Sequence, residues 1–371
     1  MKLFFKSIAE TPEKLLIVFC CFFILQTTGC ASIFSGELTA EDALEETANH
    51  RLTLTRIRGP LVDSLARSLQ YYARREGDEV LSFGHKTIPV SKAQESITAV
   101  LEKLLESPSP KELTSFLMEN FSFFRSTAPS MLITGYYEGN INGSLYKTEK
   151  FRYPIYRKPP ERLRKFTRDK IDYGGILKNK GLELAWTDDP LALFFLQIQG
   201  SGILHLPNGE TKYLNYGGQN GYPYSAIGKY MVDKGMLPTG QVSKQSIVSY
   251  LKANPSKQKE VLSQNQSYIY FRFGENRAIG SIGVTVSPYS SIATDDNLFP
   301  KGALALLKTE VPVCDKEGNI IGSSPFTELV LNQDRGGAIK GTHRVDLFMG
   351  QDECAAGRMK AKGELYFLIK K

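Results

Sequence analysis

Histidine is scarce in this sequence, and the four histidines among its 371 residues are scattered along the chain. Protein sites for zinc usually gather several histidine, cysteine or carboxylate ligands. His343 and Asp346 lie close together, but no second histidine lies near them. The sequence therefore predicts no bound metal and no other cofactor.

A strong excess of one charge is also lacking. The chain has 46 Lys and Arg against 39 Asp and Glu, a formal net charge of +7, and the two signs are interspersed. A dedicated nucleic-acid-binding protein usually clusters its basic residues on one face. The composition thus predicts no nucleic-acid partner, and its mild positive charge is compatible with an anionic polymer such as a cell wall.

The N-terminal region has no apolar run long enough to cross a membrane. Lysines precede the apolar stretch 15–25, which is too short for an ordinary transmembrane helix. This arrangement is typical of an export signal. The Thr-Gly-Cys that ends at Cys30 looks like a lipoprotein cleavage site. We expect residues 1–29 to be a signal peptide and Cys30 to be lipidated, and cleavage elsewhere is the alternative.

The residues after the predicted cleavage site extend this expectation. Ala31 favours the outer membrane over the inner membrane, by analogy with lipoprotein sorting in Gram-negative bacteria. A lipid anchor on the periplasmic face and a tether over residues 30–46 are therefore expected. Only Cys314 and Cys354 then remain in the folded part. They could pair in an oxidising compartment, but the sequence leaves their separation open.

The remaining chain changes from helical to strand-rich patterns. Apolar residues three and four apart predict helices over residues 60–75, 91–106 and 109–121. From Gly280 onward, short apolar segments alternate with Gly and Pro. We predict strands at residues 282–286, 303–307, 329–331, 344–348 and 365–369. Many short strands with turns between them indicate a β-barrel, with the helices at its periphery.

Two carboxylates bracket a glycine-rich turn within residues 331–350. Asp334 follows one predicted strand and Asp346 lies in the next. Burying an aspartate at such a place is costly unless it has a partner or a use. A turn-forming aspartate and a salt-bridged strand aspartate are the structural alternatives. The turn is no phosphate-binding loop, because Thr342 and His343 stand where that loop needs Lys and Ser or Thr.

The same residues carry a resemblance to a known family. The pattern D-x-G-G-A-I-K-G, followed by D-[LI]-[FY]-x-G, occurs here as DRGGAIKG and DLFMG. It resembles the C-terminal motif of the membrane-bound lytic murein transglycosylase A family, whose "3D" group is named for three aspartates. The three match Asp295, Asp334 and Asp346, and the likeness covers roughly residue 135 to the C-terminus.

The resemblance implies a fold. The family has a double-psi β-barrel into which a second, mainly β domain is inserted. We therefore expect a mainly β protein with peripheral helices, of class α+β. The barrel (3D) domain would comprise residues 47–139 and 274–371, and the inserted substrate-binding domain would comprise residues 140–273.

The resemblance also implies substrate-binding residues. The T-G-Y-Y and Q-G-S-G segments and the Y-x-G-x-N-G segment are characteristic of the family, and amide and aromatic groups suit sugars. For half-buried tyrosines, glycines and a solvated lysine, ordinary strand, turn or surface roles stay open. The expected substrate-binding residues are Thr134, Tyr136, Tyr137, Gln199, Gly200, Ser201, Asn220 and Lys340.

The chemistry of a lytic transglycosylase needs one carboxyl group. The nucleophile is the 6-hydroxyl of the muramic acid whose C1 is attacked, so position replaces activation of water. One acid can donate a proton to the bridging oxygen and then accept one from this hydroxyl. The resemblance assigns that role to Asp346, with Asp334 as its catalytic neighbour. Asp295 is expected to be structural, capping a loop onto the barrel.

The expected function is cleavage of the MurNAc–GlcNAc β-1,4 bond of peptidoglycan, leaving a 1,6-anhydro-MurNAc end. The alternative is a non-catalytic peptidoglycan-binding lipoprotein that keeps the barrel, because fold does not fix function. Expected partners are peptidoglycan glycan strands, the outer-membrane lipid anchor and proteins of wall synthesis or the divisome.

Overall fold

The computed structural model describes residues 38–47, 52–76, 78–275 and 277–371. The predicted signal peptide and Cys30 lie outside the described residues. Within these ranges, no helix is both long enough and apolar enough to cross a membrane. Within the stretch expected to be a tether, residues 44–47 form β1 (Leu44–Thr47), which pairs with β4 (Phe121–Ser126). The buried pair Ala43 and Leu44 is too short to give a periodic signal in the sequence.

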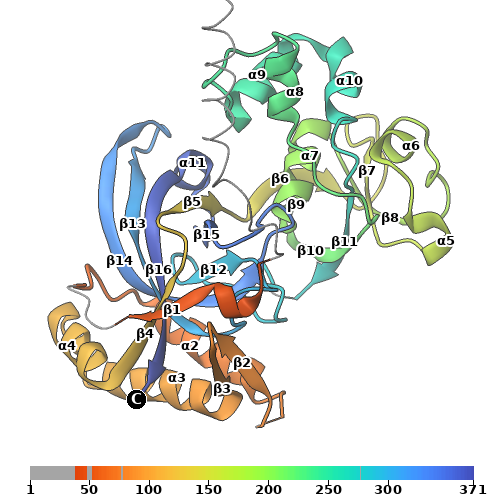
Figure 1. Ribbon diagram of the computed structural model, residues 1–371. Helices are drawn as coiled ribbons and strands as arrows, with labels where there is room; N and C mark the ends of the chain where they lie inside the picture. Colours follow the sequence, from red (N-terminus) through yellow and green to blue (C-terminus); the bar gives the residue numbers. More distant parts are fainter. Residues whose placement is uncertain (1–37, 48–51, 77, 276) are drawn as a thin grey trace, which may run out of the picture. The chain divides into compact units, whose positions relative to one another are not determined.

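Six strands close into a ring in the order β16-β13-β14-β12-β15-β5, and β5 pairs back to β16. β1 and β4 extend the sheet from β16 (Figure 1). The strands of the ring are β5 (Met131–Tyr136), β12 (Ser291–Thr294), β13 (Leu304–Cys314), β14 (Ile320–Arg335), β15 (Arg344–Phe348) and β16 (Lys360–Lys370). Their inward side chains, among them Val330, Val345 and Phe367, are fully buried. The prediction of a β-barrel is confirmed.

A second sheet of six strands is formed by the chain between β5 and β12, in the order β11-β10-β9-β6-β8-β7. A bridge from Arg157 to Phe271 links its two ends. Its strands are β6 (Gly139–Ser144), β7 (Tyr153–Tyr156), β8 (Glu183–Thr187), β9 (Gly202–His205), β10 (Thr211–Gln219) and β11 (Ile269–Gly274). Ile141, Ile155 and Leu204 lie in its core. A mainly β unit inserted into a barrel is thus confirmed.

The two crossings between ring and insert lie at one buried glutamate. The Glu138 carboxylate accepts a hydrogen bond from the Ala278 amide at 2.8 Å. The Glu138 amide donates to the Gly350 carbonyl at 2.7 Å. The outgoing and returning chains are therefore fastened to each other and to the end of β15.

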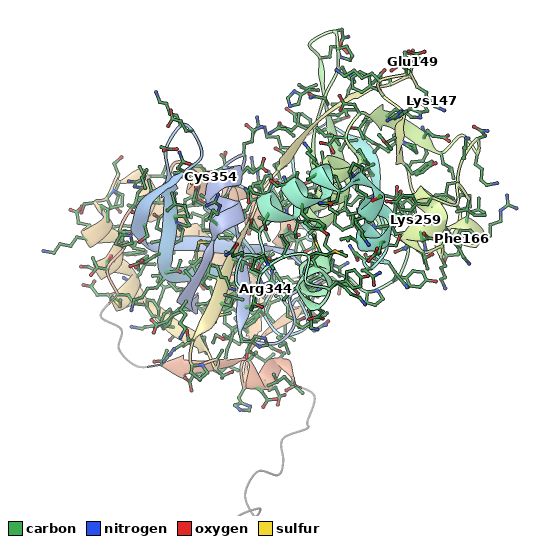
Figure 2. All side chains as sticks on the ribbon, turned by 90° about the horizontal axis from the view of Figure 1, so that it is seen from above. Lys147, Glu149, Phe166, Lys259, Arg344 and Cys354 are labelled. Carbon is green, nitrogen blue, oxygen red and sulfur yellow. A yellow bond between two sulfur atoms is a disulfide. The ribbon has the colours of Figure 1, made fainter. Side chains whose placement is uncertain are left out.

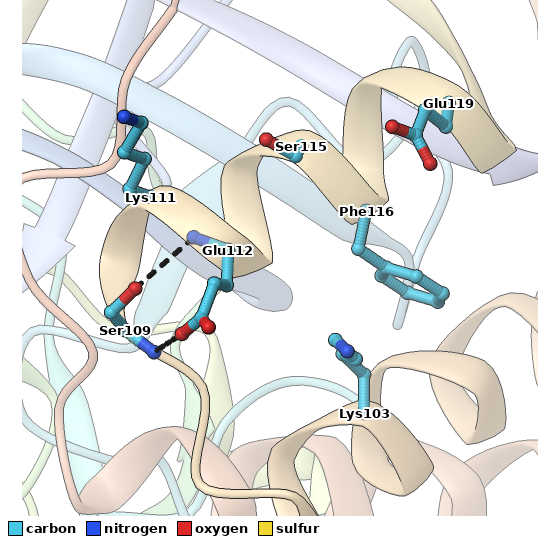
Figure 3. Close-up of a pocket in the computed structure, with 7 residues that line it drawn as sticks. All are labelled: Lys103, Ser109, Lys111, Glu112, Ser115, Phe116 and Glu119. Carbon is cyan, nitrogen blue, oxygen red and sulfur yellow. Dashed lines mark hydrogen bonds between the residues drawn. The ribbon is translucent and has the colours of Figure 1, made fainter.

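Helices lie at the periphery of both sheets (Figure 1). The predicted helices correspond to α2, α3 and α4, and α4 begins with a capping box between Ser109 and Glu112 (Figure 3). The helices and the short hairpin are η1 (Ala40–Asp42), α2 (Pro60–Tyr72), α3 (Val90–Leu105), α4 (Pro110–Asn120), α5 (Glu161–Arg164), α6 (Arg168–Asp172), α7 (Pro190–Gln199), α8 (Ile227–Asp233), α9 (Lys244–Ala253), η2 (Pro255–Lys257), α10 (Gln258–Leu262), α11 (Glu353–Arg358), β2 (Val80–Phe83) and β3 (Lys86–Pro89).

One predicted strand is wrong. Residues 282–286 form turns with a single bridge from Ile279 to Thr285. Gly283 adopts a φ of +75°, a conformation that breaks a strand and that few other residues accept. The strand of the ring is instead β12, at Ser291–Thr294, which is buried along its whole length.

A disulfide joins Cys314 at the end of β13 to Cys354 in α11 (Figure 2). The pairing that the sequence left open is therefore formed. α11 packs directly on β5, where a Cβ on Gly135 would lie 2.8 Å from the Ala356 Cα. The disulfide thus ties the β13–β14 hairpin to the helix that supports β5.

Candidate active site

The two aspartates of the motif lie on one face of the ring, separated by a single strand. Ala293 of β12 pairs with Asp334 of β14 on one side and with Asp346 of β15 on the other. Asp346 pairs in turn with Thr134 of β5. Paired residues on neighbouring strands share a face of the sheet. With strands about 4.8 Å apart, the two aspartate Cα atoms are roughly 10 Å apart, above a small alanine.

A β-bulge at Gln333 gives Asp334 this position. The register of β12 against β14 passes from Ile292–Asn332 to Ala293–Asp334, so Gln333 has no partner residue. The Gln333 amide is buried and bonds the Ser291 hydroxyl at 2.6 Å, the Ser64 carbonyl at 2.7 Å and the Ser68 hydroxyl at 2.9 Å. Without the extra residue, Gln333 would stand opposite Ala293. Bulges are frequent beside active sites because they redirect a side chain in this way.

Asp346 is held by a guanidinium and a hydroxyl. Arg344 Nε lies 2.9 Å from Asp346 Oδ1, and Arg344 Nη2 lies 3.1 Å from Oδ2. The Thr134 hydroxyl donates to Asp346 Oδ1 and also accepts from Arg344 Nη2 at 3.2 Å. Only 15% of the Asp346 side chain is exposed. The sequence predicted Thr134 as a substrate-binding residue but gave no signal for Arg344, which the family motif does not include.

Asp334 is surrounded by donors and by apolar surface. Its oxygens accept hydrogen bonds from the Tyr136 hydroxyl at 3.0 Å, the Ser281 amide at 2.9 Å and the Arg335 amide at 2.8 Å. Burial outweighs these bonds and raises the pKa of Asp334 from 3.8 to about 6. Burial and the neighbouring Asp334 raise the pKa of Tyr136 as well, so its hydroxyl stays a donor at neutral pH.

Tyr137 and Gln199 meet where β5 leads into the insert. The Gln199 side-chain carbonyl accepts a hydrogen bond from the Tyr137 amide at 3.1 Å. The Tyr137 ring is buried, and its hydroxyl bonds Glu353 of α11 at 3.2 Å and Lys244 of α9 at 2.5 Å. The structure thus brings these two predicted residues together beside Tyr136.

The other predicted residues occupy different surroundings. Gly200 ends α7 with a φ of +85°, and Ser201 follows it, half-buried, before β9. Asn220 is fully buried in the insert, and its amide bonds the Phe166 and Gln266 carbonyls and the Tyr268 amide at 2.8–2.9 Å. Lys340 is exposed in the glycine-rich turn. Direct contact of Asn220 with substrate stays a prediction, and the structure gives its amide a clear internal role.

Asp295 has the structural role expected for it. Its Oδ2 accepts from the Gly341 amide at 3.0 Å and its Oδ1 accepts from the Asn297 amide at 3.2 Å. It therefore fastens the glycine-rich turn between the two site aspartates. As for metals, the described part of the chain contains no group of three or more His, Cys, Asp or Glu residues that could hold an ion.

A closed six-stranded ring with an aspartate pair on one face and an inserted β unit defines a class of β-barrel proteins with an inserted domain. Residues 132–272 match the MltA specific insert domain, and residues 290–369 match the 3D domain. The membrane-bound lytic murein transglycosylase A of Vibrio cholerae is 30% identical over 274 residues, covering 72% of this chain and 73% of the relative. The Escherichia coli enzyme of the same name is 33% identical over 220 residues, covering 58% and 59%.

Solved structures agree with these relatives. A membrane-bound lytic murein transglycosylase from Agrobacterium tumefaciens has a TM-score of 0.71 at 27% identity, covering 88% of this chain and 98% of that chain. The Escherichia coli MltA solved with chitohexaose has a TM-score of 0.71 at 24% identity, covering 91% and 97%, and shows the shared fold. The chain belongs to the membrane-bound lytic murein transglycosylase A family. The prediction of a peptidoglycan lytic transglycosylase is thus confirmed, and the non-catalytic alternative is not favoured.

Proposed function

We propose that Asp346 is the single acid and base of this lytic transglycosylase. The observation that supports it is the pair of aspartates on one face of the ring, with only Ala293 between them. In the proposed reaction, Asp346 gives a proton to the oxygen that joins MurNAc C1 to GlcNAc, and that C–O bond breaks. The 6-hydroxyl of the same MurNAc then bonds to C1 and returns its proton to Asp346.

Asp334 acts as the neighbouring catalytic aspartate in this proposal. Its separation from Asp346 leaves room for a sugar ring above Ala293, and the Tyr136 hydroxyl reaches Asp334 from β5. A protonated Asp334 adds no second negative charge near Asp346 when the pH is below about 6.

The substrate-binding residues are proposed in two groups. Thr134, Tyr136, Tyr137 and Gln199 lie along β5 and its exit toward the insert, next to the aspartates. Gly200 and Ser201 continue from Gln199, and their backbone groups suit hydrogen bonds to sugar hydroxyls or acetamido groups. The remaining two proposals are Asn220, in the insert, and Lys340, whose ammonium suits a carboxylate on the peptide stem.

The location of the enzyme is also a proposal. The named relatives are membrane-bound. We propose that Cys30 carries lipid and anchors the enzyme to the periplasmic face of the outer membrane, where wall-synthesis or divisome proteins are its candidate partners. Palmitate labelling in a Gram-negative host should be lost in Cys30→Ala, and labelling that persists in this variant contradicts the anchor.

Mass spectrometry of a murein digest tests the mechanism. The wild-type enzyme should release muropeptides one water lighter than those of a lysozyme digest, with no new reducing end. Asp346→Asn keeps the shape but cannot donate a proton, so activity should fall by about 10²–10⁴-fold or more. Asp233→Asn, at an exposed helix end, is the matched control and should keep full activity. Hydrated muramic ends as the main product, or an active Asp346→Asn enzyme, would overturn the assignment.

A further inference from the structure

Arg344 has a contact that the proposed reaction must interrupt. It lies two residues before Asp346 on β15, so both side chains emerge on the same face. Its guanidinium donates hydrogen bonds to both carboxylate oxygens, at 2.9 and 3.1 Å (Arg344 is labelled in Figure 2). We call this two-point contact between Arg344 and Asp346 the fork. Such two-point contacts are among the strongest and most directional in proteins.

The arrangement conflicts with the first half of the reaction and suits the second. The two-point contact uses both Asp346 oxygens as charged acceptors, and a proton on Asp346 Oδ2 removes that charge and turns this oxygen into a donor. Once the C1–oxygen bond has broken, however, Asp346 is a carboxylate that must face the 6-hydroxyl. The two-point contact with Arg344 stabilises this carboxylate. The Thr134 hydroxyl, which bonds both Asp346 Oδ1 and Arg344, fixes the orientation of Oδ1.

The guanidinium has a second neighbour on the insert. Burial raises the pKa of Tyr224, and the positive charge of Arg344 lowers it in part. Tyr224 belongs to the loop between β10 and α8, whereas Asp346 belongs to the ring. Arg344 therefore interacts electrostatically with a residue of the insert as well as with Asp346 of the ring, and 29% of its side chain is exposed.

We propose that Arg344 is the positioning residue that switches Asp346 from acid to base. The fork opens when substrate binds, so that Asp346 can carry and donate its proton, and it closes again on the carboxylate that bond cleavage produces. The proton balance is that of the proposed reaction, since Arg344 neither gains nor loses a proton. This inference rests on the proposed role of Asp346.

The product ratio provides the readout, because a merely structural residue would not change it. In Arg344→Met the carboxylate loses its fixed orientation, and water can then compete with the 6-hydroxyl for C1. We expect kcat to fall by roughly 10²-fold, as misplacement of a reacting group does, with KM little changed. Hydrated muramic ends should appear beside the 1,6-anhydro ends. Arg344→Lys keeps the charge without the fork and should give an intermediate ratio.

Arg58→Met is the matched control, because Arg58 donates to both carboxylate oxygens of Glu328 with the same two nitrogens, Nε and Nη2. Glu328 lies in β14 of the ring. Arg58→Met should keep the wild-type product ratio, and thermal unfolding of each variant checks that it is folded. Wild-type kcat and purely anhydro products from folded Arg344→Met would overturn this inference alone. Full activity of Asp346→Asn would instead overturn the proposed function, so the two failures are distinguishable.

Discussion

Replacing Asp334 by asparagine should make the protein more stable and less active. Asparagine can keep the local bonds: its carbonyl accepts from the Ser281 and Arg335 amides, and its NH₂ faces the Tyr136 oxygen. What the substitution removes is a buried negative charge. A rise of the Asp334 pKa from 3.8 to about 6 corresponds to at most about 3 kcal/mol at neutral pH. Because the residue is only half-buried, we expect a gain of about 1–2 kcal/mol.

The pH dependence gives the sign of this effect. Well below pH 3.8, Asp334 is protonated in both the folded and the unfolded chain, and its charge has no influence. As the pH rises toward about 6, the unfolded chain loses this proton first, so the free energy of unfolding falls. The asparagine variant has no such loss. The stability difference in favour of the asparagine variant should therefore be absent well below pH 3.8 and complete near pH 7.5.

Urea denaturation of both proteins at a series of pH values measures this difference, with Asp233→Asn as an exposed control that should show none of it. Activity on murein should drop less than in Asp346→Asn, because Asp334 influences the acid without being it. Equal stability of the two proteins at pH 7.5, or a variant that is less stable there, would refute the reasoning from burial.

Two further changes test the support of the site. Gln333→Leu should lower the free energy of unfolding by about 2–4 kcal/mol, because several buried groups lose their hydrogen-bond partner. Murein cleavage should fall as well, because the bulge is lost. An unchanged midpoint of urea denaturation would contradict this. In the Cys314→Ser, Cys354→Ser double variant, the free energy of unfolding should fall by about 4 kcal/mol, because the disulfide closes a loop over a sequence separation of 40. Urea denaturation measures this, and equal free energies for the variant and the oxidised wild type would argue against it.

The sequence predicted what local patterns encode. β15 at Arg344–Phe348 matches the predicted range, because alternating and flanking apolar residues mark it. The aspartate motif was predictable because its glycines and acids are contiguous in the chain. β14, in contrast, extends over Ile320–Arg335, far beyond the predicted residues 329–331. Its outer half is exposed and contains Gly, Ser and Pro, and it is a strand because β13 pairs with it.

Features set by distant partners were not predictable. The bulge at Gln333 depends on hydroxyl and carbonyl groups of α2 and β12, far away in the sequence. The Arg344 fork follows from the pleat of β15, which no motif expresses. Asn220 is a further case, because the sequence predicts sugar binding for its amide but does not express its bonds to backbone near residues 166 and 266.

The bond between Glu138 and Ala278 has a consequence for modularity. The chain leaves the ring and returns to it at neighbouring points, so the insert is joined to the ring by two adjacent chain segments. Among the described residues, none of the ring's strand pairings involves a strand of the insert. The insert could therefore be replaced at these two segments by one of different length or origin without a change in the strand register of the ring. A fold built this way can change what it binds without rebuilding the strands that hold its aspartates.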